Sequence, residues 1–173
     1  YTDIIAGAKK SILELQGQGG TPALVTINEA PFYDYGIGAI GSTSGHAFVL
    51  TNTGQSRAVT LAEVGLDRII YDLIGGVWPG TGGTCGVEIL GGASCTISVG
   101  FTPNNLGLLA DTIEVKYFDG VSDQTTPRNI QGTGVIPANL EISDGDPYDY
   151  GTLIVGQTVN KLFTITNTGG MLG

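Results

Sequence analysis

The sequence predicts an all-β fold, and three observations support this prediction. Short runs rich in Val, Ile, Leu and Thr recur along the chain, and several alternate apolar with polar residues, as strands with one buried face do. Glycine contributes 29 of 173 residues without a regular period, which is typical of tight turns rather than of collagen. Hydrophobic residues reach 41%, so the chain is not a disordered tail.

The charge balance narrows the classes of partner. The net charge is −9 and only 7 residues are Lys or Arg, so a basic surface for nucleic acid or an anionic membrane is not expected. No apolar run approaches the ~18 residues that a membrane-spanning helix needs. Residues 1–10 lack the pattern of a signal peptide and the first residue is not Met, so we read the chain as a mature or excised segment.

An internal repeat organises the chain. YDYG occurs at residues 33–36 and 148–151, and TNTG occurs at 51–54 and 166–169. Both pairs are 115 residues apart (148 − 33 and 166 − 51), and the same register matches QGQGGTPALVTI with QGTGVIPANLEI further upstream. A repeat of this length is too long for a solenoid and has the size of an immunoglobulin-like β-sandwich.

The register divides the chain into three segments of tandem immunoglobulin-like sandwiches. We expect residues 1–21 to be closing strands of a preceding unit, residues 22–136 to be one complete unit, and residues 137–173 to be opening strands of a following unit. The complete and following units begin at Pro22 and Pro137, as suits domain boundaries, where few contacts cross.

Within the complete unit, about seven short strands separated by turn residues are typical of a sandwich. We expect strands at residues 23–27, 46–52, 58–66, 68–74, 95–101, 111–118 and 128–134. Alternation in 46–52 places Phe48 and Leu50 on one face. The pattern at 4–16 would also suit an amphipathic helix, but the repeat aligns its end with a closing strand, so we expect a strand there.

The two cysteines, Cys85 and Cys95, are ten residues apart. Their spacing fits no zinc motif, and His46 is the one histidine in the chain. A local disulfide is favoured over two buried free thiols, and it would indicate an oxidising compartment. Closing so short a loop contributes roughly 2.5–3 kcal/mol in the chain-entropy description.

A set of motifs resembles one known family. The motifs are Tyr35-Gly36, Gly41 with Thr43, Asn52-Thr53-Gly54, the core from Gly92 to Pro103, and Gly132-Thr133-Gly134. Together they resemble the bacterial choice-of-anchor D repeat, which belongs with the ASH-type (ASPM, SPD-2, Hydin) immunoglobulin-like domains and is also similar to the major sperm protein fold. Tyr35 and Tyr150 depart from the family, where Phe is commoner.

The resemblance implies a secreted or surface-attached bacterial protein of many tandem repeats without catalytic activity. It also implies that Cys85 and Cys95 correspond to a paired cysteine of the bacterial members. Partners would be neighbouring repeats of the same chain or of adjacent subunits, together with a protein or glycan ligand at the surface.

The repeated motifs are expected to have structural roles. Tyr33, Tyr35 and Gly36, with Tyr148, Tyr150 and Gly151, would mark the boundary at which each unit begins, and Asp34 and Asp149 would bond a turn there. Gly54 would supply a positive φ at the end of a strand. Gly132 and Gly134 would allow a bulge or a close approach of the next domain.

The sequence contains no nucleophile elbow, phosphate loop or zinc helix, so we expect no enzyme. His46 is the one possible imidazole base, and its equivalent in the repeat is Lys161, so a role as a strand residue is favoured.

Two features could bind ligands. Asp144, Asp146 and Asp149 could supply oxygen ligands to calcium, although a solvated turn is the simpler interpretation, and Asp119 with Asp123 forms a weaker loop of the same kind. Trp78 lies in a glycine-rich loop and could contact a glycan or protein, or fold back over its own core. No other cofactor is expected.

Three functions follow from these features. The first is a non-catalytic structural or adhesive repeat that spaces, displays or assembles at the bacterial cell surface. The second is a subunit of an extracellular filament assembled by strand exchange between chains. The third is a carbohydrate- or cation-dependent binding module attached to an enzyme.

Overall fold

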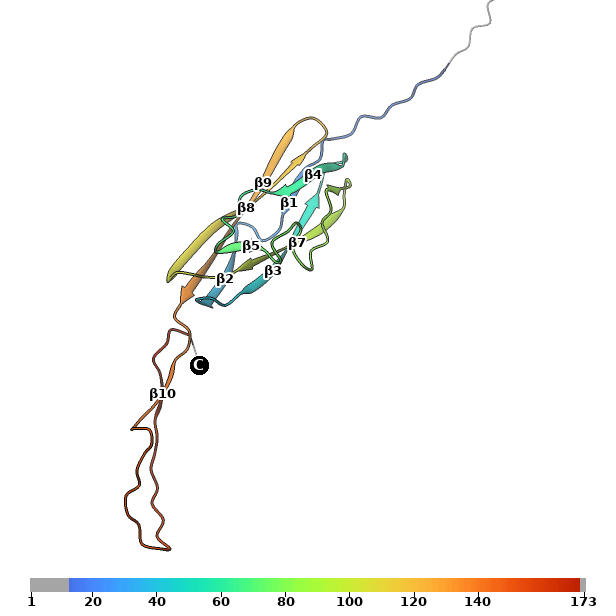
Figure 1. Cartoon of the computed structure of the whole chain (residues 1–173). Helices are drawn as coiled ribbons and strands as arrows, with labels where there is room; N and C mark the ends of the chain where they lie inside the picture. Colours follow the sequence, from blue (N-terminus) through green and yellow to red (C-terminus); the bar gives the residue numbers. More distant parts are fainter. Residues whose placement is uncertain (1–12, 172–173) are drawn as a thin grey trace, which may run out of the picture.

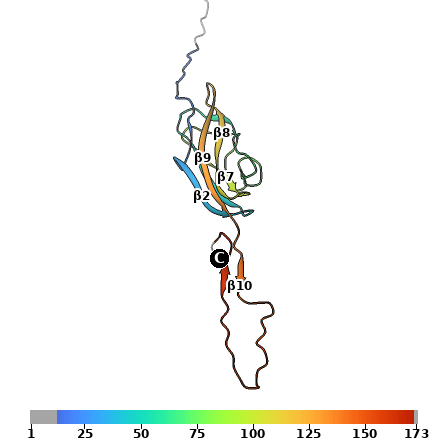
Figure 2. The same cartoon turned by 90° about the vertical axis from the view of Figure 1, so that its left-hand side faces the viewer.

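The computed structural model describes residues 13–171, and its main body is a sandwich of two β-sheets (Figures 1 and 2). One sheet has the order β1-β3-β7-β5 and contains β1 (Val25–Ile27), β3 (Ser44–Asn52), β7 (Ser94–Phe101) and β5 (Tyr71–Leu73). The other has the order β2-β9-β8-β4-β6 and contains β2 (Phe32–Ala39), β9 (Asp123–Val135), β8 (Gly107–Phe118), β4 (Ala58–Glu63) and β6 (Glu88–Ile89).

All strand pairs in the sandwich are antiparallel except one. β2 pairs in parallel with β9, and a bulge interrupts this pairing between Asp34 and Ile37. β8 and β9 form a long hairpin whose register runs without a break from Gly107 opposite Gly134 to Phe118 opposite Asp123. β9 is therefore held on both sides, by β8 and by β2.

The core lies between the two sheets and follows the alternation of the sequence. Phe48 and Leu50 of β3 are fully buried and belong to the same core cluster as Ile113 and Val115 of β8, which are also fully buried. Burying a side chain of this size stabilises a fold by about 1.5–3 kcal/mol. The alternating runs therefore account for the sandwich.

Each of the seven regions that the sequence predicts as strands contains a strand, and β2 and β6 are additional. The sequence predicts a turn at YDYG, at the boundary of the unit, but these residues lie within β2. Its tyrosines are half-buried and pack against the core, while Asp34 between them is exposed, so the stretch alternates as a strand does.

Most of the strand predicted at residues 4–16 lies outside the described residues. The described part of that range, residues 13–16, is extended but pairs with no strand. Backbone pairing needs a partner, and the residues that the structure describes provide none for this segment.

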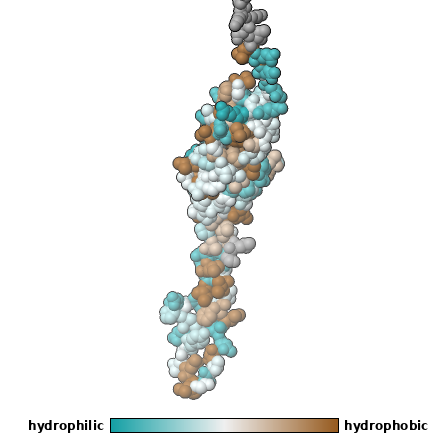
Figure 3. Space-filling model, turned by 90° about the vertical axis from the view of Figure 1, so that its right-hand side faces the viewer, coloured by the Kyte–Doolittle hydropathy of each residue, from teal (hydrophilic) through white to brown (hydrophobic). Residues whose placement is uncertain are grey.

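A second, smaller unit follows the sandwich. β10 (Leu140–Ile142) and β11 (Ile165–Asn167) pair as an antiparallel hairpin with a long excursion between them (Figure 1). The apolar residues of this hairpin are largely exposed, and Figure 3 shows hydrophobic side chains along its surface. The predicted segment boundaries at 21/22 and 136/137 remain predictions.

No helix occurs among residues 13–171, and hence none in that range is long and apolar enough to cross a membrane.

Candidate functional site: the connector clamp

The Asn-Thr-Gly motif at the end of β3 holds the segment through which the chain enters the sandwich, residues 21–24, which we call the connector. Asn52 is fully buried, and its Oδ1 accepts hydrogen bonds from the backbone N–H of Leu24 at 3.0 Å and of Gly54 at 3.1 Å. Its Nδ2 donates to the carbonyl oxygens of Ser56 at 2.8 Å and Ile89 at 3.0 Å. One amide side chain thus ties the connector to the turn after β3 and to β6.

Gly54 is required by close packing and not by a positive φ, so the expectation for this residue is wrong. Gly54 is absent from the described glycines that have a positive φ. A Cβ at this position would lie 2.0 Å from the carbonyl oxygen of Pro22. The connector therefore runs directly over the glycine, where no larger residue fits.

Backbone hydrogen bonds complete this clamp. The N–H of Thr53 donates to the carbonyl of Leu24 at 2.8 Å, and the N–H of Ser56 donates to the carbonyl of Thr21 at 3.0 Å. The N–H of Thr21 in turn donates to Oε1 of Gln55 at 3.0 Å. Both ends of the connector are fixed to the same turn.

The same clamp occurs a second time, 115 residues later, after β11. Oδ1 of Asn167 accepts from the N–H of Asn139 at 3.1 Å and of Gly169 at 3.0 Å. The N–H of Thr168 donates to the carbonyl of Asn139 at 2.8 Å. A Cβ on Gly169 would lie 2.0 Å from the carbonyl oxygen of Pro137. The repeat in the sequence is therefore also a repeat in geometry.

The Tyr-Asp-Tyr-Gly stretch repeats its geometry as well. The rings of Tyr33 and Tyr35 lie 4.9 Å apart at 87°, and those of Tyr148 and Tyr150 lie 5.0 Å apart at 88°. Gly36 and Gly151 have φ values of 74° and 70°, and each donates its N–H at 2.7 Å to the preceding aspartate, Asp34 or Asp149. The predicted bond between this aspartate and its local backbone is present in both copies.

A basic side chain lies over the first tyrosine of each copy. The ring of His46 stacks on Tyr33 at 3.8 Å, and its Nε2 lies 3.5 Å from Oε1 of Glu29. The equivalent Lys161 has its Nζ 4.9 Å from the centre of the Tyr148 ring and 2.9 Å from Oδ1 of Asp144.

The hydrogen bond from Lys161 lowers the pKa of Asp144, and the same bond raises the pKa of Lys161. In both copies an acidic and a basic side chain therefore meet at the opening of the unit.

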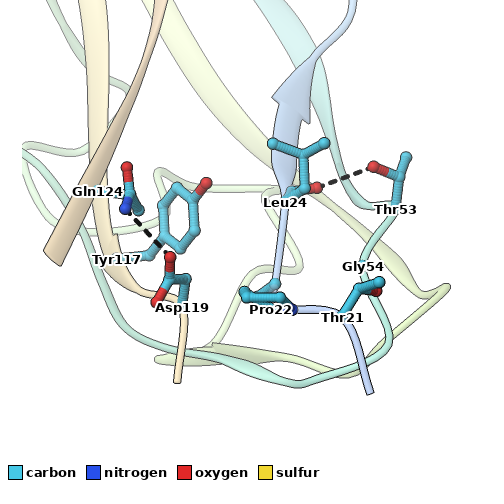
Figure 4. Close-up of a pocket in the computed structure, with 9 residues that line it drawn as sticks. Thr21, Pro22, Leu24, Thr53, Gly54, Tyr117, Asp119 and Gln124 are labelled. Atoms are coloured by element: carbon cyan, nitrogen blue, oxygen red, sulfur yellow. Dashed lines mark hydrogen bonds between the residues drawn. The ribbon is translucent and has the colours of Figure 1, made fainter. Parts of the chain in front are cut away.

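An open pocket of about 480 Å³ lies beside the connector (Figure 4). Pro22 and Leu24 line one side, and Tyr117, Asp119 and Gln124 line the other. Asp119 is buried and accepts hydrogen bonds from the N–H groups of Val121 and Ser122, both at 2.7 Å, and from Nε2 of Gln124 at 3.1 Å. The bonds from its own turn, that of Ser122 foremost, lower the pKa of Asp119.

The structure does not gather the predicted calcium ligands into one site. Asp144 binds Lys161 and Ser143, whereas Asp149 accepts from Gly151. Asp146 takes part in no described hydrogen bond. Among residues 13–171 no group of three or more acidic, His or Cys residues could hold a metal ion. The loop that contains Asp119 and Asp123 therefore forms no such group either.

Cys85 and Cys95 form the predicted disulfide, which joins the loop before β6 to β7. Trp78 is half-buried, packs against the core and donates its Nε1–H to the carbonyl of Gly86 at 2.9 Å. The sequence leaves two interpretations open for Trp78. These contacts match the second, in which the ring folds back over its own core.

Glycine is required at positions 132 and 134 by close packing within the same unit. No contact with a following domain is needed to explain either residue. A Cβ on Gly132 would lie 2.5 Å from the Phe101 ring, and one on Gly134 would lie 2.0 Å from the carbonyl oxygen of Asn105. The one bulge in this strand pair lies opposite, between Asp34 and Ile37.

Sequence reasoning missed two side chains that fix β2 to β9. Nε2 of Gln131 donates to Oδ2 of Asp34 at 2.8 Å, and the guanidinium of Arg128 donates to the carbonyl of Pro31 at 3.2 Å. The repeat carries a signal for the first contact, because Gln16 and Asp149 occupy the equivalent positions.

No protein-family model and no curated protein matches the chain. Solved structures with a similar fold include the VesB protease of Vibrio cholerae, at 14% identity and a TM-score of 0.49 over 65% of this chain and 32% of that chain. The chain therefore spans about a third of the length of VesB.

Two further similar structures come from other sources. The ASH / PapD-like domain 7 of human CEP192 has 13% identity and a TM-score of 0.42 over 76% of this chain and 97% of that domain. A family 123 glycoside hydrolase from Clostridium perfringens has 7% identity and a TM-score of 0.41 over 68% of this chain and 28% of that chain. Likenesses of this degree carry no argument about function.

Proposed function

We propose that this chain is a non-catalytic spacer from a tandem array of immunoglobulin-like units, and that the array extends from or assembles at a bacterial cell surface. The connector clamp is the observation that carries the proposal. Its Asn-Thr-Gly residues and the two hydrogen bonds that the asparagine Oδ1 accepts occur twice, around residues 21–24 and around residues 136–139. A clamp that recurs at each junction would limit the movement of one unit against the next.

The short distance between units supports a spacer function. β9 ends at Val135, and β10 begins at Leu140. Within these four intervening residues, the carbonyl of Ile136 accepts hydrogen bonds from the N–H groups of Gly170 and Met171, both at 3.1 Å. Few rotatable bonds are left free, so we expect a stiff joint.

Placement outside the cytoplasm and membership of the choice-of-anchor D repeats are part of the proposal. The Cys85–Cys95 disulfide supports an oxidising compartment, because cytosolic thiols are normally kept reduced. The family motifs support a surface repeat, and their residues have structural roles: Asn52 is the centre of the clamp and Gly132 packs on Phe101.

A glycan-binding function has less support. The ring of Trp78 packs on its own unit, and its Nε1–H already has a partner in Gly86. A ligand would have to displace both contacts.

The proposal is tested with a two-unit chain in which residues 22–135 are followed directly by residues 21–173. Spin labels on the exposed Lys116 position of both copies report the distance between units by electron–electron double resonance. A stiff spacer gives one narrow distance distribution. A matched chain with Gly-Ser-Gly inserted after Val135 of the first copy serves as the flexible reference.

A distribution as broad as that of the flexible reference would overturn the spacer function. The compartment is tested separately by alkylating the native protein without reductant and measuring its mass. We expect neither cysteine to be alkylated, and alkylation of both would contradict the exported location.

A further inference from the structure

Residues 13–20 contain glycines and leucines whose positions are not explained by their surroundings in the described structure. A Cβ added to Gly17 or Gly19 would have no neighbouring atom within 4 Å, and neither glycine has a positive φ. Leu13 and Leu15 are 82% and 87% exposed. Neither turn geometry nor packing in the described structure requires glycine or leucine at these positions.

The equivalent glycine and apolar positions in β9 are explained by packing. In the repeat register, Gly17 and Gly19 correspond to Gly132 and Gly134, which are fitted closely against the Phe101 ring and a loop carbonyl of their own unit. The neighbouring positions correspond as well. Leu15 is the equivalent of Ile130, which is 2% exposed, and Gln16 is the equivalent of Gln131.

We infer that residues 13–20 form a closing strand that docks into another immunoglobulin-like unit of this design, in the position that β9 occupies here. The strand would run antiparallel to the equivalent of β8 and parallel to a Tyr-Asp-Tyr-Gly strand, as β9 does. This inference rests on the proposed tandem array and adds the residues by which one unit recognises the strand.

Three contacts define that recognition. The glycines lie under an aromatic ring and a loop carbonyl, where a Cβ does not fit. Leu15 fills the buried position of Ile130. Gln16 donates to the aspartate of the Tyr-Asp-Tyr-Gly strand, as Gln131 donates to Asp34 at 2.8 Å. The partner is therefore a sandwich with an acidic edge strand and a phenylalanine beneath the slot.

The partner unit has two possible sources, which the experiment distinguishes. One is a preceding unit of the same polypeptide. The other is the complete unit of a second copy, in which residues 13–20 would take the place of the equivalent residues of β9 by strand exchange.

The test compares amide hydrogen exchange in three chains. The first is the 173-residue chain at low and high concentration. The second is the two-unit chain defined above, whose first unit keeps Ile130–Val135 as its closing strand. The third joins residues 22–129 directly to residues 15–173, so that residues 15–20 must close the first unit.

In the third chain we expect the amides of residues 15–20 to exchange at least about 100-fold more slowly than in the dilute 173-residue chain, because they become paired. Protection that appears in the 173-residue chain only at high concentration identifies a second copy as the source. Absence of protection there at every concentration identifies the same polypeptide.

Glycine variants of the third chain test the recognition itself. Gly17→Val and Gly19→Val are expected to remove the protection, whereas Gly145→Ala, at a position with open space, leaves it unchanged. The inference is overturned if residues 15–20 of the third chain stay unprotected while the second chain folds, or if both valine variants keep full protection. The junction distance in the second chain tests the spacer function independently.

Discussion

Asn52 holds four hydrogen bonds while fully buried, and its partners come from three different segments of the chain. A buried amide in this position satisfies backbone groups that water cannot reach. Its equivalent, Asn167, has the same partners on the connector side although the surrounding unit is open to solvent. The bonds of the side chain therefore follow from the local backbone, and burial makes them costly to lose.

Asn52→Ala is expected to lower the free energy of unfolding by about 2–4 kcal/mol, because it leaves buried donors and acceptors without partners. Chemical denaturation measures the change. Asn104→Ala, at an exposed loop position, is the matched control and should change stability by less than about 0.5 kcal/mol. Equal effects of the two substitutions would contradict the central role of Asn52 in the clamp.

Gly54→Ala tests close packing against the connector. A methyl group would meet the carbonyl oxygen of Pro22 at 2.0 Å, and we expect a loss of about 1–3 kcal/mol as the connector is pushed away. Gly86→Ala is the control, since Gly86 has open space and no positive φ, and the substitution there should be neutral or slightly stabilising. Thermal unfolding of the two variants gives the comparison, and similar melting temperatures would refute this explanation of Gly54.

At the scale of elements, alternation predicted the strands that bury one face, such as β3 and β8. It did not predict β2, because Pro31 and the glycines at 36 and 38 are typical of turns. The pairing of β2 with β9 is parallel and joins residues nearly one hundred positions apart, from Phe32 opposite Asn129. No local pattern encodes such a pairing, so the position of the tyrosines in the core could not be predicted.

The pair of Glu29 and His46 could have been predicted in part. Their equivalents, Asp144 and Lys161, keep an acid and a base in the same register, which is a signal for contact. The tyrosine beneath the base could not be predicted, because the sequence around Tyr33 does not reveal strand β2. Because β2 could not be predicted, the contact between His46 and Tyr33 could not be predicted either.

The turn between β8 and β9 is expected to make stability depend on pH. The N–H groups of Ser122 and Val121 lower the pKa of Asp119 in the folded protein. A carboxyl with a lowered folded pKa stabilises fully above its unfolded pKa of about 3.9, and this contribution is lost as the pH falls through the folded pKa. Asp119→Asn should therefore be less stable than the parent at pH 7, with a difference that shrinks below about pH 4.

Denaturation at a series of pH values measures this difference. Asp123→Asn, at an exposed position of the same hairpin, controls for the loss of one negative charge. A destabilisation by Asp119→Asn that stays constant down to pH 2 would show that the charge of Asp119 is not responsible.

The disulfide between Cys85 and Cys95 is expected to stabilise the folded protein. Replacing both cysteines by serine should lower the free energy of unfolding by roughly 2.5–3 kcal/mol, because the unfolded chain regains the entropy of the open loop. Reducing the parent protein should have a similar effect. A loss below about 1 kcal/mol in both experiments would contradict this entropic contribution of the disulfide.

At the scale of the whole molecule, the two units differ in what covers their apolar faces. Val25 and Ile27 of β1 are 2% and 3% exposed, whereas their equivalents Leu140 and Ile142 of β10 are 62% and 61% exposed. The hydrogen bonds that the asparagine Oδ1 accepts are the same in both units, so the difference in exposure lies in packing and not in this local geometry. The second copy therefore has the conformation of an opening unit without the burial that stabilises one.

A two-stranded hairpin alone is marginal in water, so the amides of β10 and β11 are expected to exchange within about 10-fold of the rate of an unfolded chain. Those of β1 and β3 should exchange only through global unfolding, at least about 1,000-fold more slowly. Hydrogen exchange on the dilute 173-residue chain measures both sets, and β3 is the internal control. Equal protection of the two hairpins in dilute solution would contradict this prediction, since apolar burial would then not be what stabilises the opening of a unit.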